Sequence, residues 1–273
     1  MTATHFTLTK NYYLYKNFWR FSGAPHEEKP IDEDLALSLL KQGGLLVRNT
    51  HGFDCQEDTG FWYVVKDQFG GLEELKPRIR RKVKSAFKHI EYRIETPSFV
   101  LQNGGYDIYT AAFNAYKIKE KKLLRPAFED LFEVQPTECM VCIDKETQKM
   151  IGFAINHVWE NAVGYEFSAI LPEYRHNPTY AYYGLFHARN EHYLQNMKKH
   201  YVTDGSRSIT EHSGVQDWLI ENFGFRKAYC HLDIYYKRWM EAAIKMLYPL
   251  RKIITNRRVK AVLNMEAMRR GEK

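Results

Sequence analysis

The chain has 273 residues, of which 44% are hydrophobic and 27% are charged. This length is enough for one large domain or two small ones, and the composition excludes a wholly disordered protein. The net charge is +7. No apolar run approaches the roughly 20 residues that a transmembrane helix needs.

Four cysteines are too few for a disulfide framework in a chain of this length. The N-terminal residues MTATHFTLTK contain no apolar signal segment. We therefore expect a reduced, cytoplasmic protein. Cys139 and Cys142 have C-x-x-C spacing, but they lie in the strand-like run CMVCI, where residues three apart point to opposite faces. We expect no metal site.

The N-terminal part predicts a helix over 32–43, with Asp32 as its N-cap, and strands over 45–54 and 60–69. An amphipathic helix is predicted over 72–88, because its apolar residues recur at spacings of three and four. Its other face is strongly basic and carries Lys76, Arg78, Arg80, Arg81, Lys82, Lys84 and Lys88. This face is either a solvated surface or a surface that receives a phosphate-bearing substrate.

The rest of the chain alternates between helical and strand-like patterns. Residues 139–171 predict three antiparallel strands, and 178–200 predict a long helix with Asn177 as N-cap and Pro178 in its first turn. The other predicted elements are strands over 90–102, 201–209 and 226–239 and helices over 105–119, 125–134 and 213–225.

The C-terminal tail carries most of the excess charge, since residues 240–273 hold nine Lys/Arg against three Glu. Its apolar residues form a partly helical stripe: Met240, Ala243, Ile244, Leu247, Leu250, Ile254 and Leu263. Three interpretations are open: a helix packed on the core, a surface for anionic lipid, or a nucleic-acid contact.

From residue 139 onward the predicted order is strand, strand, strand, helix, strand, helix, strand. In this order lie P-E-Y-R at 172–175 and E-N-F-G-F-R-K at 221–227. Together these features resemble the GNAT (GCN5-related N-acetyltransferase) superfamily over residues 139–239. The resemblance implies an α/β (α+β) fold, with a mixed, mostly antiparallel central sheet flanked by helices. We expect a smaller N-terminal α/β portion at 1–104, the acyltransferase domain at 105–239 and a basic helical tail at 240–273.

Two positions depart from the usual GNAT pattern. The family's pyrophosphate loop has glycines that let the backbone approach the anion at a helix N-terminus. Here Arg175 matches the start of that loop, but Pro178 and Tyr180 occupy the glycine positions. Many members also carry a catalytic Tyr four residues before the Gly of the G-F pair, and this position is Ile220.

The FemAB-like acyltransferases resemble this chain better, because they have GNAT-like folds without the glycine loop. LKPRIRRKVKSAFKHIEYRIE (75–95) and YVTDG (201–205) resemble segments of that branch. The resemblance implies transfer of an acyl or aminoacyl group from acyl-CoA or aminoacyl-tRNA to an amine, such as that of a cell-envelope precursor. Residues 72–88 and 240–273 would contact tRNA or anionic lipid, with the protein peripheral to the inner face of the membrane.

Two other functions remain open. The missing glycines and the missing Tyr favour a GNAT-like module that has lost catalysis and binds an anionic partner, either nucleic acid or a membrane surface. An unrelated basic α/β protein that contacts RNA is the third interpretation.

The candidate catalytic residues lie near the place where the fourth and fifth strands of a GNAT fold diverge. Glu166 is an acid in an otherwise apolar strand, where it is costly to bury without a partner. Asp204 and His212 are the other candidate bases, and His187 is weaker. Exposed strand faces, a turn at Asp-Gly and a solvated histidine are the alternative explanations. The candidate donor-binding residues are Arg175, Asn177, Thr179, Ser206 and Ser208.

Overall fold

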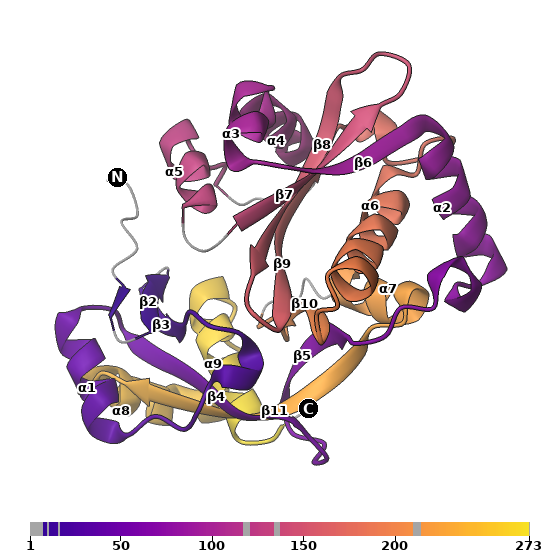
Figure 1. Ribbon diagram of the computed structural model, residues 1–273. Helices are drawn as coiled ribbons and strands as arrows, with labels where there is room; N and C mark the ends of the chain where they lie inside the picture. Colours follow the sequence, from indigo (N-terminus) through magenta and orange to yellow (C-terminus); the bar gives the residue numbers. More distant parts are fainter. Residues whose placement is uncertain are drawn as a thin grey trace. The chain divides into compact units, whose positions relative to one another are not determined.

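The computed structural model describes residues 8–9, 11–15, 17–116, 121–133, 137–209 and 214–272. The chain forms two compact units, each built from more than one stretch of sequence (Figure 1). The first unit comprises mainly 65–205 and 218–225, and the second comprises 6–64, 206–217 and 226–273.

These units do not follow the predicted boundaries after residues 104 and 239. Strand β4 (Leu46–Cys55) pairs antiparallel with β11 (Arg226–Tyr236), so an N-terminal and a C-terminal segment share one unit. The sequence pattern predicts each strand but contains no information on this pairing across about 180 residues of chain.

The first unit contains the three antiparallel strands that were predicted over 139–171. Neighbouring strands are antiparallel from β6 to β9, whereas β9 and β10 are parallel. The strands are, in spatial order, β6 (Ile90–Glu95), β7 (Thr137–Asp144), β8 (Met150–Val158), β9 (Ala162–Ile170) and β10 (Tyr201–Ser206). The sheet is therefore mixed and mostly antiparallel, as predicted.

Helices cover both faces of this sheet (Figure 1). The α-helices of this part of the chain are α2 (Pro77–His89), α3 (Pro97–Gln102), α4 (Gly105–Asn114), α5 (Arg125–Glu129), α6 (Ala181–Asn190) and α7 (Gly214–Phe223). Short 3-10 helices lie at Gly71–Glu74, Asp130–Phe132 and Pro172–Tyr174.

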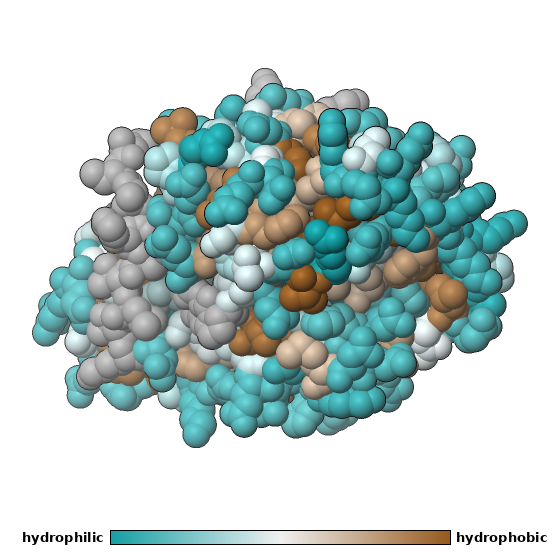
Figure 2. Space-filling view, turned by 45° about the horizontal axis from the view of Figure 1, so that its top comes forward, coloured by the Kyte–Doolittle hydropathy of each residue, from teal (hydrophilic) through white to brown (hydrophobic). Residues whose placement is uncertain are grey.

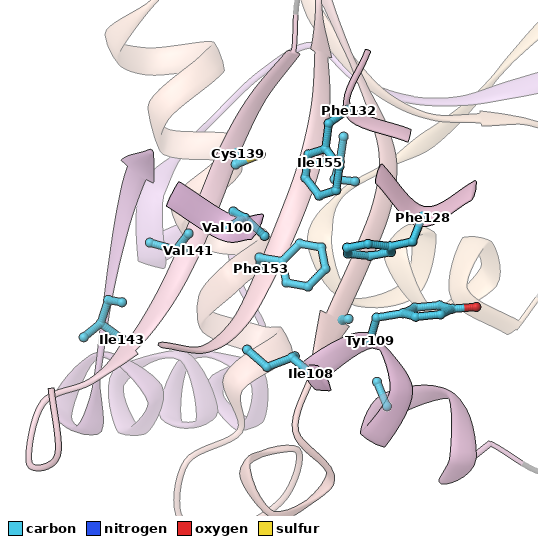
Figure 3. Close-up of a cluster of buried hydrophobic side chains, with 12 residues drawn as sticks. Val100, Ile108, Tyr109, Phe128, Phe132, Cys139, Val141, Ile143, Phe153 and Ile155 are labelled. Atoms are coloured by element: carbon cyan, nitrogen blue, oxygen red, sulfur yellow. The ribbon is translucent and has the colours of Figure 1, made fainter. Parts of the chain in front are cut away.

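Alternation along β7 divides the hydrophobic core into two clusters. Cys139 and Val141 face α4 and α5, where Phe128 and Phe153 pack edge to face (Figure 3). Cys142 faces the other way, into the cluster beneath α6. The two cysteines are therefore on opposite faces of the strand, as the spacing predicted.

The predicted start of the long helix is wrong. Helix α6 begins at Ala181, and Tyr180 precedes it in the left-handed region with φ of 44°. The residues before α6 form a turn that contains the cis Asn177–Pro178 bond. This turn is closed by the hydrogen bond from Tyr180 N–H to His176 O. Asn177 is therefore in this turn and does not cap the helix. At the other end, Glu191–Asn196 continues α6 as a π-helix.

The second unit contains the remaining strands and helices. The described strands besides β4 and β11 are β1 (Leu8–Thr9), β2 (Tyr12–Tyr15), β3 (Phe18–Phe21) and β5 (Phe61–Lys66), whose last two residues belong to the first unit. The helices are α1 (Glu33–Gln42), α8 (Arg238–Leu247) and α9 (Arg257–Arg269), with 3-10 helices at Pro25–Glu27 and Tyr248–Leu250. The Asp32 carboxylate accepts from Leu35 N–H, so its predicted role as N-cap is confirmed.

Part of the basic tail packs on the second unit's core. Leu263, Met265 and Met268 of α9 are buried, and α9 contacts β11. Glu266 is also buried and accepts hydrogen bonds from Tyr236, Arg269 and Arg270. For α9 these contacts favour the interpretation of a helix packed on the core.

Hydrophilic side chains cover most of the face shown in Figure 2, and hydrophobic side chains show between them in small patches. None of the described helices has the length and apolar character needed to cross a lipid bilayer.

Candidate active site

Strands β9 and β10 separate inside the first unit. Their parallel pairing runs from Tyr201 opposite Ala162 to Thr203 opposite Gly164. Among the described residues, no pairing between the two strands follows, although β9 continues to Ile170. The next residues on the two strands are Tyr165 and Asp204, and we call this point, where the pairing ends, the opening.

A β-bulge places Glu166 at this opening. Ile155 of β8 pairs with Phe167, but the next residue of β8, Asn156, pairs with Tyr165. Glu166 is therefore the extra residue of β9, and a bulge of this kind redirects side chains locally.

The bulge also changes the faces of its two neighbours. In a regular strand Tyr165 and Phe167, two residues apart, would share one face. Tyr165 packs against Phe186 and Tyr193 on the α6 side, and Phe167 packs against Phe153 in the cluster beneath α4.

Two acids lie close to the opening. The Glu166 side chain is 36% exposed, and its Oε2 lies 3.9 Å from Nδ1 of the more buried His157. Burial raises the pKa of Asp204 to about 7, the Arg189 guanidinium opposes this rise, and the nearby Glu166 carboxylate adds to it. Asp204 therefore changes its charge near neutral pH, as a general base should.

Arg189 of α6 is buried beside these acids, with 1% of its surface exposed. Its Nε donates to Asn156 Oδ1 at 2.8 Å, and its guanidinium carbon lies 3.4 Å from the centre of the Tyr165 ring. The hydroxyl of Tyr165 in turn donates to Asn190 Oδ1 at 2.8 Å. These contacts hold the Arg189 guanidinium against Tyr165, the first residue of β9 after its pairing with β10 ends.

Two buried donors in this cluster lack an acceptor. Among the described residues, neither Nη2 of Arg189 nor Nδ2 of Asn190 has a hydrogen-bond partner. A buried polar group without a partner costs free energy and requires an explanation, such as a ligand atom that is bound during function. A carbonyl oxygen is a suitable acceptor for either donor.

The predicted donor-binding loop is closed by its own hydrogen bonds. Arg175 donates through Nε and Nη2 to the carbonyl of Ile170 and through Nη2 to that of Ala112. The Thr179 hydroxyl donates to the carbonyls of Tyr174 and His176. Asn177 is exposed in the same turn.

Basic α2 lies beside the N-terminus of α6. Lys82 Nζ donates to the Tyr183 hydroxyl at 2.8 Å and lies 5.2 Å from the centre of the Tyr180 ring. The exposed Arg78, Arg81 and Lys84 extend this positive surface along α2. An anion could therefore contact α2 without any glycine in the loop.

The remaining predicted residues are placed elsewhere. Ser206 and Ser208 belong to the second unit, where the Ser206 hydroxyl accepts from Arg48 and Ser208 N–H donates to Gln216. His212 lies outside the described residues. His187 is buried between Phe69 and Phe87, and burial lowers its pKa. It lines an open groove of about 590 Å³ with residues of α2 and of the loop before it.

No group of three or more His, Cys, Asp or Glu side chains is arranged to hold a metal ion in the described part of the chain. The cluster at the opening thus consists of Glu166, Asp204 and Arg189 with the supporting side chains Asn156, His157 and Tyr165. Both acids were already candidates from the sequence pattern. Arg189 was missed, although an arginine three residues after Phe186 and four before Tyr193 on one helix face is a usable signal.

No protein-family model matches this sequence, and none of the curated proteins is significantly similar to it. Among solved structures, the crystal structure of FemX matches with a TM-score of 0.51 at 11% sequence identity, covering 82% of this chain and 72% of FemX. This match shows that the chain has the GNAT/FemAB-like fold that its motifs indicated.

Two further solved structures are similar at lower scores. The C-terminal domain of a putative lysylphosphatidylglycerol synthetase from Agrobacterium fabrum has a TM-score of 0.46 at 13% identity, with 80% of this chain and 69% of that chain covered. A GCN5-related N-acetyltransferase-like protein from Streptococcus suis has a TM-score of 0.40 at 11% identity, with 83% of both chains covered.

Proposed function

We propose that the protein is an acyltransferase that transfers an acyl or aminoacyl group from an activated donor to an amine. The observation that carries this proposal is the opening between β9 and β10, where an acid with a pKa of about 7 lies beside a second acid and a buried arginine. This arrangement provides both a base and a place for a carbonyl group.

In the proposed reaction Asp204 accepts the proton that the amine loses as it attacks the donor carbonyl. A nitrogen–carbon bond forms, and the carbon–sulfur bond of a thioester or the carbon–oxygen bond of an aminoacyl ester breaks. The leaving thiolate or ribose oxygen takes a proton from solvent. Glu166 attracts the amine in its ammonium form, which releases one proton to solvent before the neutral amine attacks. The unpartnered donors of Arg189 and Asn190 bind the carbonyl oxygen.

The loop at residues 176–180 is closed by hydrogen bonds. This supports an acyl donor that is not bound by the backbone amides of the loop. The basic surface of α2 beside the N-terminus of α6 supports an anionic donor, and both acyl-CoA and aminoacyl-tRNA are anionic. The FemAB-like fold favours an acceptor amine of the cell-envelope-precursor class.

The test combines donors with acceptors and detects the amide product by mass spectrometry. The full chain is incubated with acyl-CoA thioesters or charged tRNA and a panel of amines that includes cell-envelope precursors. Transfer by the wild type should fall by about 10²- to 10⁴-fold in Asp204→Asn. Glu166→Gln should mainly raise the KM for the amine, because Glu166 binds the ammonium form.

The matched control is Glu173→Gln, which removes an exposed acid from the same unit. Its rate should equal that of the wild type. Full transfer by Asp204→Asn would contradict the assignment of the base. The absence of transfer with every donor would contradict the proposed reaction.

The closed loop also favours a second candidate function, a GNAT-like module without catalysis that binds an anionic partner. Ile220, at the position where many members of the superfamily carry a Tyr, supports the same candidate. This second candidate function predicts salt-sensitive binding of RNA or lipid, and no product with any of the donors and acceptors above.

A further inference from the structure

Helix α8 and the turn after it carry an exposed apolar row. The exposed fractions of Trp239, Met246 and Ile253 are 62%, 71% and 73%, and that of Leu250 is 49%. Single exposed apolar residues are ordinary on protein surfaces. Four large ones within 15 residues of chain form a patch, and such patches mark interaction sites.

The part of the row on α8 lies on one side of the helix. Trp239 and Met246 are seven residues apart, which is close to two helical turns, and Leu250 and Ile253 follow in the 3-10 helix and the turn after it. Met240 and Ile244 on the other side are buried in the second unit, with 9% and 6% of their surface exposed. The row therefore points away from the core that holds the helix.

A basic row runs beside the apolar one. Arg238, Lys245 and Lys252 each precede a residue of the apolar row, and all three are exposed. Arg257 and Arg258 extend the positive surface into the start of α9. Glu241, which pairs with Lys245 at 2.8 Å, is the only acid between residues 238 and 258.

Helix α2 is more basic than α8 but carries no such apolar row. Its apolar residues Ile79, Val83 and Ala86 are buried, and its exposed face is polar. Helix α2 therefore presents charge alone, whereas α8 presents charge together with exposed apolar side chains. Variants of the two helices can distinguish the effects of these two kinds of surface.

We propose that the surface formed by Arg238–Ile253, the α8 surface, docks the protein on an anionic lipid surface. A tryptophan and aliphatic side chains enter the interface between headgroups and acyl chains, and the basic row contacts lipid phosphates. Charge complementarity selects this occupant, because each cation near an anionic membrane strengthens binding roughly fivefold. The inference is independent of the proposed reaction.

The test is sedimentation of the full chain with vesicles of phosphatidylcholine alone or mixed with phosphatidylglycerol. The wild type should sediment with the anionic vesicles, and part of this binding should survive high salt. Substituting Trp239, Met246 and Ile253 together by Ser should remove the salt-resistant part. Replacing the basic row by Gln should weaken binding on the order of 100-fold at low salt.

Two controls match these variants. Arg78→Gln, Arg81→Gln and Lys88→Gln together remove three exposed charges from α2, and Leu124→Ser removes an apolar side chain that is 70% exposed in the first unit. Both should bind as the wild type does. Brominated lipid should quench Trp239 fluorescence, and Trp239→Phe should abolish this quenching while the protein still binds.

Three results would overturn the proposal: no sedimentation of the wild type, equal loss in the α2 control, or undiminished binding of the triple Ser variant. A shift of that variant to a smaller species in gel filtration without lipid would instead assign the α8 surface to a second copy of the chain. Thermal unfolding of each variant checks that its fold is unchanged.

Discussion

Asp204 is partly buried and has two charged neighbours, the cation Arg189 and the anion Glu166. Burial raises its pKa from 3.8 to about 7, although Arg189 opposes the rise. The folded state therefore holds the proton more tightly than the unfolded state. The resulting stability is fully present below pH 3.8 and is lost as the pH rises through 7.

This linkage predicts that Asp204→Asn stabilises the protein at alkaline pH. Asn carries no charge to bury, so the variant should be more stable than the wild type by on the order of 2–4 kcal/mol at about pH 8.5. The difference should decrease steadily toward about pH 4. Urea denaturation at several pH values measures it, with Glu173→Gln as the control. A constant difference across this range would contradict the assigned pKa.

At the residue scale, the sequence made both acids candidates but did not predict their surroundings. Glu166 and Asp204 could be selected because acids in apolar strands are unusual. Their proximity depends on the bulge at Glu166 and on the end of pairing after Thr203, and neither feature has a distinct residue pattern. Arg189 was missed because buried arginine is rare and helical arginines are usually solvated.

Helix α6 carries Arg189 and packs against Tyr92 of β6 at Gly184. A Cβ on Gly184 would lie 2.5 Å from Cζ of Tyr92, and the Tyr92 hydroxyl is held by its hydrogen bond to Ala181 O at 2.9 Å. Only glycine therefore permits this packing without movement of the ring or the helix.

Gly184→Ala should destabilise the protein by about 1–3 kcal/mol, because overpacking outweighs the better helix propensity of alanine. Gly214→Ala is the control, since nothing lies within 4 Å of its added Cβ in the first turn of α7. It should leave stability unchanged or slightly raised. Chemical denaturation measures both, and adding Tyr92→Leu to Gly184→Ala should recover part of the loss.

At the element scale, hydrophobic periodicity predicted most helices and strands, including α1 and the strands over 139–171. The predicted start of α6 was wrong because Pro178 is compatible both with the first turn of a helix and with a non-helical turn that precedes a helix. Hydrogen bonds from Thr179 and Tyr180 to upstream carbonyls favour the turn. These hydrogen bonds form only in the folded loop, so the sequence pattern does not reveal them.

At the scale of the whole molecule, the sequence predicted the class of fold but not how the chain divides. Packing of the tail on the core was one of three open interpretations, and α9 does pack on β11. The pairing of β11 with β4 from the N-terminal part was not predicted. Long-range pairing of this kind depends on the register and packing of complete strands.

Glu266 is the polar centre of this tail packing. Its carboxylate, with 2% of the side chain exposed, accepts from Arg269 Nη2 at 2.6 Å, from Arg270 Nε at 2.8 Å and from the Tyr236 hydroxyl at 3.0 Å. Burial raises the pKa of Glu266, but the hydrogen bonds from both arginines outweigh burial and lower it below 4.5.

Glu266→Gln should destabilise the full chain by about 2 kcal/mol near neutral pH, because both arginines lose a charged acceptor. A lowered pKa means that the wild-type advantage is present above pH 4.5 and is lost as the pH falls through the folded pKa. Urea denaturation should therefore show a difference that shrinks in acid. Glu241→Gln, which breaks an exposed pair on α8, should have a smaller effect. Equal stability of Glu266→Gln and wild type at neutral pH would mean that this buried cluster does not hold α9 on the second unit.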